Sequence, residues 1–168
     1  LDEGRSGAGP ITRFDATKFK TQFACEVKNF NPQDYMNVKE VRKNDRYCHF
    51  ATIAADQAIE DSQMNLDSTD KTRVGVILGS GVGGIETMTV EMMSFALSDQ
   101  EPSFSPFLIP KMIADIASGL VSIKYGFMGP NYATVSACAS SSHAIHNAFN
   151  LIRYDEADVM ITGGAEAA

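Results

Sequence analysis

The sequence lacks any apolar run long enough to cross a lipid bilayer, and no basic segment followed by an apolar one opens it. Neither a membrane span nor a secretory leader is therefore expected. Positive charge is also scarce, since 14 Lys and Arg stand against 21 Asp and Glu and leave a net charge of −7. Because phosphate binding needs a local excess of Lys and Arg, this balance argues against nucleic acid as a bulk partner.

Cysteine is sparse, with three residues far apart at Cys25, Cys48 and Cys138. An odd number without CxxC spacing disfavours both a disulfide framework and a zinc site, so no metal is expected. Reduced thiols are typical of the cytoplasm, which is the expected location. A chain of 168 residues with 44% hydrophobic content can bury a core. It begins at Leu1 in a loop-like segment, which suggests a fragment.

Apolar spacing predicts an α/β arrangement. Residues up to 37 show no sustained period and predict surface loop with short extended pieces, such as residues 23–27. Helical periodicity predicts helices over residues 39–61, 85–97, 109–125 and 140–154, and short apolar runs predict strands over 73–78, 132–135 and 159–162. The last strand, helix and strand form a βαβ unit, which implies parallel strands.

Cys138 lies at the junction between the strand predicted over 132–135 and the helix predicted over 140–154, among the small residues TVSACASSS at 134–142. A sharp strand-to-helix turn that exposes a nucleophile needs such neighbours. The positive end of the helix would favour the thiolate, and its free N–H groups could donate to an oxyanion. The alternative interpretation is a small buried apolar residue, which is also the expectation for Cys25 and Cys48.

The segment GPNYATVSACAS at residues 129–140 resembles the active-site segment of β-ketoacyl-acyl-carrier-protein synthases, especially the elongating type II enzyme. Further matches follow in order: GPITRFD at 9–15, GSGVGG at 79–84, SPF at 105–107 and ADVMITGGAE at 157–166. The resemblance implies a thiolase-like α/β fold. The chain would be most of the first half of such an enzyme, with a mixed sheet between helices. The opening strand and the whole second half would lie outside residues 1–168.

In that family, the cysteine that matches Cys138 takes an acyl group from carrier protein as a thioester, and its backbone N–H is one donor of the oxyanion hole. The thioester then condenses with the carbanion left by decarboxylation of malonyl-carrier protein. The resemblance therefore implies an acyltransferase of fatty-acid synthesis that uses acyl carrier protein, needs no cofactor and forms a homodimer. The two histidines and the lysine that assist decarboxylation belong to the second half, so condensation by this chain alone is not expected.

The resemblance also places Val82 where a side chain gates acyl length, and Leu108 where one reaches the partner subunit's tunnel. Taken alone, the glycine cluster at 79–84 is weak evidence for a nucleotide site, because it lacks a Walker lysine. Lys39, Arg42 and Lys43 lie at i, i+3 and i+4 on one helix face and match carrier-docking positions. Ordinary solvated surface is the other interpretation of this triplet.

Two other functions stay open on the sequence. Another thiolase-fold enzyme, such as a thiolase, a type III initiating synthase or a polyketide ketosynthase domain, would share these motifs. A non-catalytic chain-length partner subunit would keep the fold. Such subunits typically carry another residue at the position of Cys138, and this argues against that alternative.

Overall fold

The computed structural model describes residues 3–99, 101 and 103–167, so that Leu1 at the loop-like start lies outside them. The N-terminal segment holds two short strands and continues into six helices and three longer strands. They are β1 (Gly9–Pro10), β2 (Phe23–Ala24), α1 (Val38–Lys43), α2 (Arg46–Asp61), β3 (Val74–Gly79), α3 (Ile85–Leu97), α4 (Leu108–Met112), α5 (Ile116–Tyr125), β4 (Asn131–Thr134), α6 (Ser140–Arg153) and β5 (Val159–Gly164).

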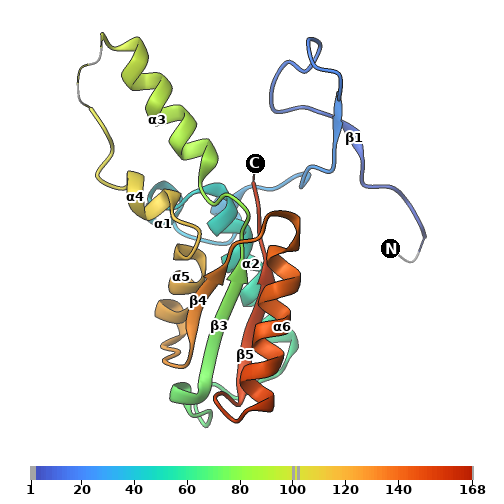
Figure 1. Cartoon of the computed structure of the whole chain (residues 1–168), viewed down its shortest axis with the longest axis vertical. Coiled ribbons are helices and arrows are strands. Elements are labelled where there is room, and N and C mark those ends of the chain that lie inside the picture. Colours follow the sequence, from blue (N-terminus) through green and yellow to red (C-terminus); the bar gives the residue numbers. More distant parts are fainter. Residues whose placement is uncertain (1–2, 100, 102, 168) are drawn as a thin grey trace.

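A parallel sheet with the order β4-β3-β5 forms the centre of the fold. Helix α6 covers one face of the sheet, and α2 and α5 cover the other (Figure 1). Every residue of β3 is buried, as a continuous β-branched run between two helical layers requires. The predicted unit of β4, α6 and β5 is present, but β3 lies between its two strands. The separate β1-β2 ladder is antiparallel. The predicted α/β fold is therefore confirmed.

The single helix predicted over residues 39–61 is wrong, because the chain forms two helices there. α1 ends at Lys43, and the buried Asp45 caps α2 by accepting a hydrogen bond from the N–H of Tyr47 at 3.2 Å. The second carboxylate oxygen of Asp45 accepts from the N–H and the hydroxyl of Thr87 in α3, at 3.2 and 2.5 Å. This contact with α3 stabilises the interruption between α1 and α2. Because Thr87 is distant in the sequence, no local pattern could reveal the contact.

The helix predicted over residues 109–125 is also two helices. The chain leaves the helical conformation at Ile113, with φ −67° and ψ 137°. The carbonyl of Ile113 accepts a hydrogen bond from the hydroxyl of Tyr47 at 2.5 Å, and the carbonyl of Met112 accepts one from the N–H of Gly84 at 3.0 Å. Carbonyls that a continuous helix would use internally are thus taken by α2 and by the loop after β3.

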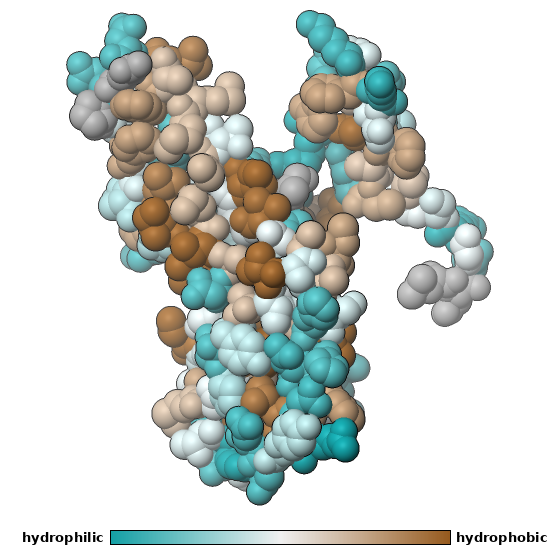
Figure 2. Space-filling model, viewed as in Figure 1, coloured by the Kyte–Doolittle hydropathy of each residue, from teal (hydrophilic) through white to brown (hydrophobic). Residues whose placement is uncertain are grey.

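Helix α3 extends away from the sheet and buries none of its residues (Figure 1). Apolar side chains gather on the surface over α4 and near the N-terminal end of α3 (Figure 2). Helix α6 also has an exposed apolar stripe, formed by Ile145, Phe149 and Ile152. Among the described residues, no helix combines the length and the apolar character that a membrane crossing requires.

Candidate active site

The three parallel strands end together at one edge of the sheet. Gly79 at the end of β3 pairs with Thr134 of β4 on one side and with Gly164 of β5 on the other. The glycine loop at 80–84, the turn around Cys138 and the residues after β5 therefore leave the sheet side by side. This carboxyl edge is where open parallel sheets place their ligands.

Cys138 lies in a tight turn between β4 and α6, as the sequence predicts. Residues Ala137–Ala139 form a 3-10 turn that runs directly into α6. Ala137 has a φ of +49°, in the left-handed region that residues with a side chain seldom adopt. Cys138 is exposed and free, so its thiol is open to a substrate. A strained, exposed strand-to-helix turn is the geometry that presents a nucleophile.

Side-chain hydrogen bonds hold this turn in place. The buried hydroxyl of Ser140 donates to the carbonyl of Ala137 and accepts from the N–H of Ser136, both at 2.8 Å. The hydroxyl of Thr134 donates to the carbonyl of Ser140 at 2.7 Å. Ser136 Oγ and His143 Nδ1 share a further hydrogen bond of 2.6 Å. The backbone on both sides of Cys138 is therefore fixed to β4 and to the first turns of α6.

Helix α6 begins directly after the 3-10 turn that holds Cys138. Its N-cap, Ala139, has no side-chain hydrogen bond, so the cap side chain satisfies none of the N–H groups of the first turn. These N–H groups and the helix dipole place partial positive charge at this end of the helix. Donors of this kind can stabilise an oxyanion formed on an acyl carbonyl.

The glycine loop lies against the Cys138 turn. The N–H of Ser80 donates to the carbonyl of Thr134 at 3.2 Å, and Gly81 stands over Ala137. Val82 follows, with 52% of its surface exposed. The structure thus brings the loop that carries Val82 next to the predicted nucleophile.

Glu166 anchors this loop from the other side of the sheet edge. Its Oε2 accepts hydrogen bonds from the N–H of Gly81 at 2.7 Å and of Val82 at 3.0 Å. Sequence reasoning gave Glu166 no role. An acidic residue shortly after a strand carries no signal for a partner more than eighty residues earlier in the chain.

The other predicted site residues lie on α1 and α4. Leu108 is the first residue of α4 and is half-buried, and α4 packs against α3. Lys39, Arg42 and Lys43 are all exposed on α1. Lys43 holds its ammonium 5.6 Å from the centre of the Phe107 ring. Within the described part of the chain, neither Lys39 nor Arg42 forms an ion pair, so both leave their charge to solvent.

Comparison with known proteins decides the family. Residues 1–168 match the family model described as the N-terminal domain of β-ketoacyl synthase. The chain belongs to this family. It is 46% identical over 169 residues to the 3-oxoacyl-(acyl-carrier-protein) synthase 2 of Synechocystis sp., with all of this chain and 40% of that protein covered. The β-ketoacyl synthase domain therefore spans about 40% of the length of this relative.

Solved structures confirm the thiolase-like fold of this β-ketoacyl synthase domain. The ishigamide ketosynthase/chain length factor superposes with a TM-score of 0.86 at 26% identity, covering 98% of this chain and 41% of that one. A ketosynthase bound to a hexaketide, in complex with its type II PKS acyl-carrier protein, superposes with a TM-score of 0.78 at 23% identity. This match covers 84% of this chain and 40% of that one. At 23% identity, the match to the ketosynthase in complex with its acyl-carrier protein supports the fold alone.

The remaining cysteines and histidines of the β-ketoacyl synthase domain lie after β2, on α2 and on α6. Cys48 is buried, as expected, and burial raises the pKa of its thiol to about 12. Cys25 is exposed, so the expectation that it is a buried apolar residue is wrong. His49 is buried on α2 with Nε2 3.2 Å from the carbonyl of Val41, and burial lowers its pKa. His146 pairs with Asn150 on the exposed side of α6.

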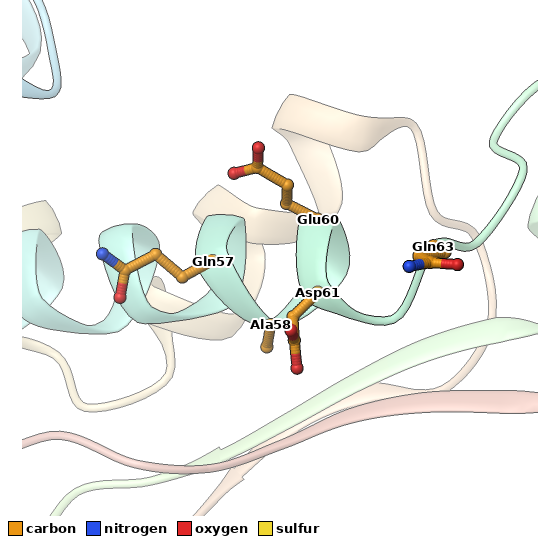
Figure 3. A pocket seen from close by; sticks show the side chains of 5 residues that line it. All are labelled: Gln57, Ala58, Glu60, Asp61 and Gln63. Carbon is orange, nitrogen blue, oxygen red and sulfur yellow. The ribbon is translucent and has the colours of Figure 1, made fainter.

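A surface pocket lies far from this site, at the end of α2 (Figure 3). Its lining comes from the last turns of α2 and from the segment just after it: Gln57, Ala58, Glu60, Asp61 and Gln63. The neighbouring Asp56 accepts hydrogen bonds from Lys124 and Tyr125 at the end of α5, toward the amino edge of the sheet. The pocket holds no nucleophile, and we assign it no role.

Proposed function

We propose that this chain forms the acyl-accepting part of a 3-oxoacyl-acyl-carrier-protein synthase of fatty-acid elongation, with Cys138 as the nucleophile. One observation carries the proposal. An exposed, free cysteine lies in a strained turn directly before α6, whose N-cap side chain satisfies none of the first N–H groups of the helix. The 46% identity to a 3-oxoacyl-(acyl-carrier-protein) synthase 2 supports acyl groups on carrier protein as the substrate class.

The first proposed step is acyl transfer. The thiolate of Cys138 attacks the carbonyl carbon of an acyl-carrier thioester, and the N–H of Cys138 donates to the resulting oxyanion. The bond from carbon to the carrier sulfur then breaks, and the released carrier thiolate takes up the proton that Cys138 gave up. The acyl group remains on Cys138 as a thioester.

The second proposed step is decarboxylative condensation. Malonyl-carrier protein loses carbon dioxide, and its carbanion attacks the thioester carbon on Cys138. The Cys138 thiolate leaves, and the lengthened 3-oxoacyl chain remains on the carrier. We propose that the two histidines and the lysine that assist this step lie outside residues 1–168, because His143 shares a hydrogen bond with Ser136, His146 shares one with Asn150 and His49 is buried.

We further propose that residues 1–168 are most of the N-terminal half of a two-half, homodimeric enzyme. The 40% span of its relative fits this size. In the described sheet β4 is an edge strand, and its side of the fold exposes Tyr132 and Val135. Such an unpaired edge needs a covering partner, and a second copy joined along β4 would supply it.

Acyl carrier protein is the proposed partner, with Lys39, Arg42 and Lys43 as its docking residues. A carrier of strongly acidic character would be attracted by this exposed basic face on an otherwise acidic chain. Val82 is proposed to gate the length of the acyl chain, and Leu108 is proposed to reach the acyl tunnel of the partner subunit. Val82 is the better supported of the two because its loop adjoins the Cys138 turn. A cytoplasmic location is proposed because the reaction needs a reduced thiol.

Another ketosynthase activity, such as that of a polyketide ketosynthase domain, is the second candidate, since the ishigamide ketosynthase/chain length factor superposes on this chain with a TM-score of 0.86. Its identity of 26% is well below the 46% to the 3-oxoacyl-acyl-carrier-protein synthase, so elongation of fatty acids is favoured. The presence of Cys138 favours an enzyme over a chain-length partner subunit.

The test is condensation by the full-length gene product that carries this chain. Acyl-carrier protein and malonyl-carrier protein are supplied, and 3-oxoacyl product is followed by mass spectrometry. The unaltered protein should form product, Cys138→Ser should reduce the rate by at least about a thousandfold, and Cys25→Ser, the other exposed cysteine, should leave it unchanged. Full activity in Cys138→Ser would contradict the proposal.

A further inference from the structure

The carboxylate of Glu166 crosses from the end of β5 to the loop that follows β3. One oxygen, Oε2, accepts from two consecutive backbone N–H groups, those of Gly81 and Val82. Hydrogen bonds to a charged acceptor are roughly twice as strong as those between neutral groups. Among the described residues Glu166 forms no ion pair with Lys or Arg, so these two amides are its partners. A single side chain therefore fixes the middle of the loop.

The two ends of the same loop are already tied to the sheet edge. The N–H of Ser80 bonds the carbonyl of Thr134 at 3.2 Å, and the hydroxyl of Ser80 accepts from the N–H of Gly83 at 3.1 Å. Gly84 bonds the carbonyl of Met112 at 3.0 Å. Between these ties, Gly81 and Val82 depend on Glu166 for the position of their backbone.

The composition of the loop makes this dependence strong. Gly81, Gly83 and Gly84 give its backbone wide conformational freedom, and Gly83 uses it with a φ of +72°. The side chain of Val82 is half-exposed, so little packing within the described residues would hold it. Without the carboxylate, the middle of the loop would sample several positions beside the Cys138 turn.

We propose that Glu166 is a positioning residue for acyl-chain selection. By holding the amides of Gly81 and Val82 it sets where the Val82 side chain stands beside the Cys138 turn, and so how long an acyl chain the thiol accepts. The inference rests on the proposed acyl transfer to Cys138. Glu166 itself contacts the loop, not the acyl group, and moves no proton.

The experiment measures rates of Cys138 acylation in the full-length gene product, using a series of acyl-carrier proteins that differ in chain length. The readout is the ratio of the rates for the preferred and the longest chain. Glu166→Ala should lower this ratio by about tenfold, the loss of roughly one strong hydrogen-bonded contact. Glu166→Gln keeps an acceptor oxygen and should stay within about twofold of the unaltered protein.

Two controls separate positioning from a folding defect. Glu156→Ala removes an exposed carboxylate near the opposite end of β5 and should leave the ratio unchanged. Alkylation of Cys138 by iodoacetamide should proceed at a similar rate in every variant. If Glu166→Ala does not fold, Glu166→Asp serves instead. It withdraws the carboxylate by one methylene, and it should give an intermediate ratio.

The outcomes distinguish this inference from the function on which it rests. An unchanged ratio in Glu166→Ala, or an equal fall in all acylation rates, would overturn the positioning role alone. No acyl adduct on Cys138 in the unaltered protein would overturn the proposed function and this inference with it. A lowered ratio in Glu166→Ala that Glu166→Gln restores would support both.

Discussion

The backbone of Gly79 lies directly against the backbone of Ser140, so that the end of β3 meets the first turn of α6 without room for a side chain. A Cβ atom on Gly79 would overlap the carbonyl group of Ser140. Cys138 precedes Ser140 by only two residues. The position of the proposed nucleophile is therefore set by a glycine in the central strand.

Gly79→Ala should displace the start of α6. We expect the free energy of unfolding to fall by about 1–3 kcal/mol, the usual cost of forcing a methyl group into a packed site. Alkylation of Cys138 should slow because the turn moves. Denaturant titration and the alkylation rate of the full-length gene product check this.

Gly119→Ala in α5 is the matched control, because nothing lies within 4 Å of a Cβ atom there. Alanine is the better helix former, so this variant should gain about 0.5–1 kcal/mol. If Gly79→Ala were as stable as the unaltered protein and as reactive at Cys138, the packing argument would be wrong.

Charge reversal on the basic face of α1 should weaken the docking of acyl carrier protein. Arg42→Glu should raise the KM for acyl-carrier protein by about tenfold at low salt, with less effect as salt screens the attraction. The kcat at saturation should not change. Arg153→Glu, the same substitution at the far end of α6, should leave the KM within about twofold. Equal KM values for the two variants would exclude α1 as the docking face.

His49 should make stability depend on pH. Burial lowers the pKa of its imidazole below the usual 6.5, so the unfolded chain binds the proton more tightly than the folded one. The free energy of unfolding should therefore decrease as pH falls from 6.5 toward the lowered pKa, with a slope of at most about 1.4 kcal/mol per pH unit. Urea titrations of the unaltered protein and of His49→Gln test this. A decrease of the same size in His49→Gln would assign it to other groups.

The apolar stripe of α6 should make residues 1–168 aggregate when they are expressed alone. Ile145, Phe149 and Ile152 are 52%, 61% and 47% exposed on one side of the helix. Exposed apolar patches of this kind mark surfaces that need a partner. Phe149→Glu should increase the monomer fraction in size-exclusion chromatography, whereas Ser142→Glu on the same helix should not. A monomeric, cooperatively unfolding form of residues 1–168 would contradict the prediction.

The spacing of apolar residues predicted those helices and strands whose formation depends on nearby residues. The run of Val74 to Leu78 is apolar enough to require burial, and α3, α6, β4 and β5 lie close to their predicted ranges. The position of the Cys138 turn is predicted for the same reason, because a short apolar strand, a run of small residues and a helical period follow one another there. Such junctions are common in α/β folds, so the choice of Cys138 as nucleophile comes from the resemblance to β-ketoacyl synthases.

Long-range contacts account for what the sequence did not reveal. Two predicted helices are broken because Asp45 reaches Thr87 and because Tyr47 takes the carbonyl of Ile113. The place of β3 between β4 and β5 depends on pairing between distant segments. Glu166 escaped notice because its partners, the amides of Gly81 and Val82, are backbone groups, which every residue type except proline supplies.

Acylation of Cys138 is the most direct test of the account. The full-length gene product is incubated with acyl-carrier protein and digested, and the peptide that contains Cys138 is weighed by mass spectrometry. We predict one acyl group on that peptide, removed by hydroxylamine as a thioester and absent in Cys138→Ser. An unmodified Cys138 peptide, or an acyl group carried by Cys25 instead, would contradict the assignment of the nucleophile.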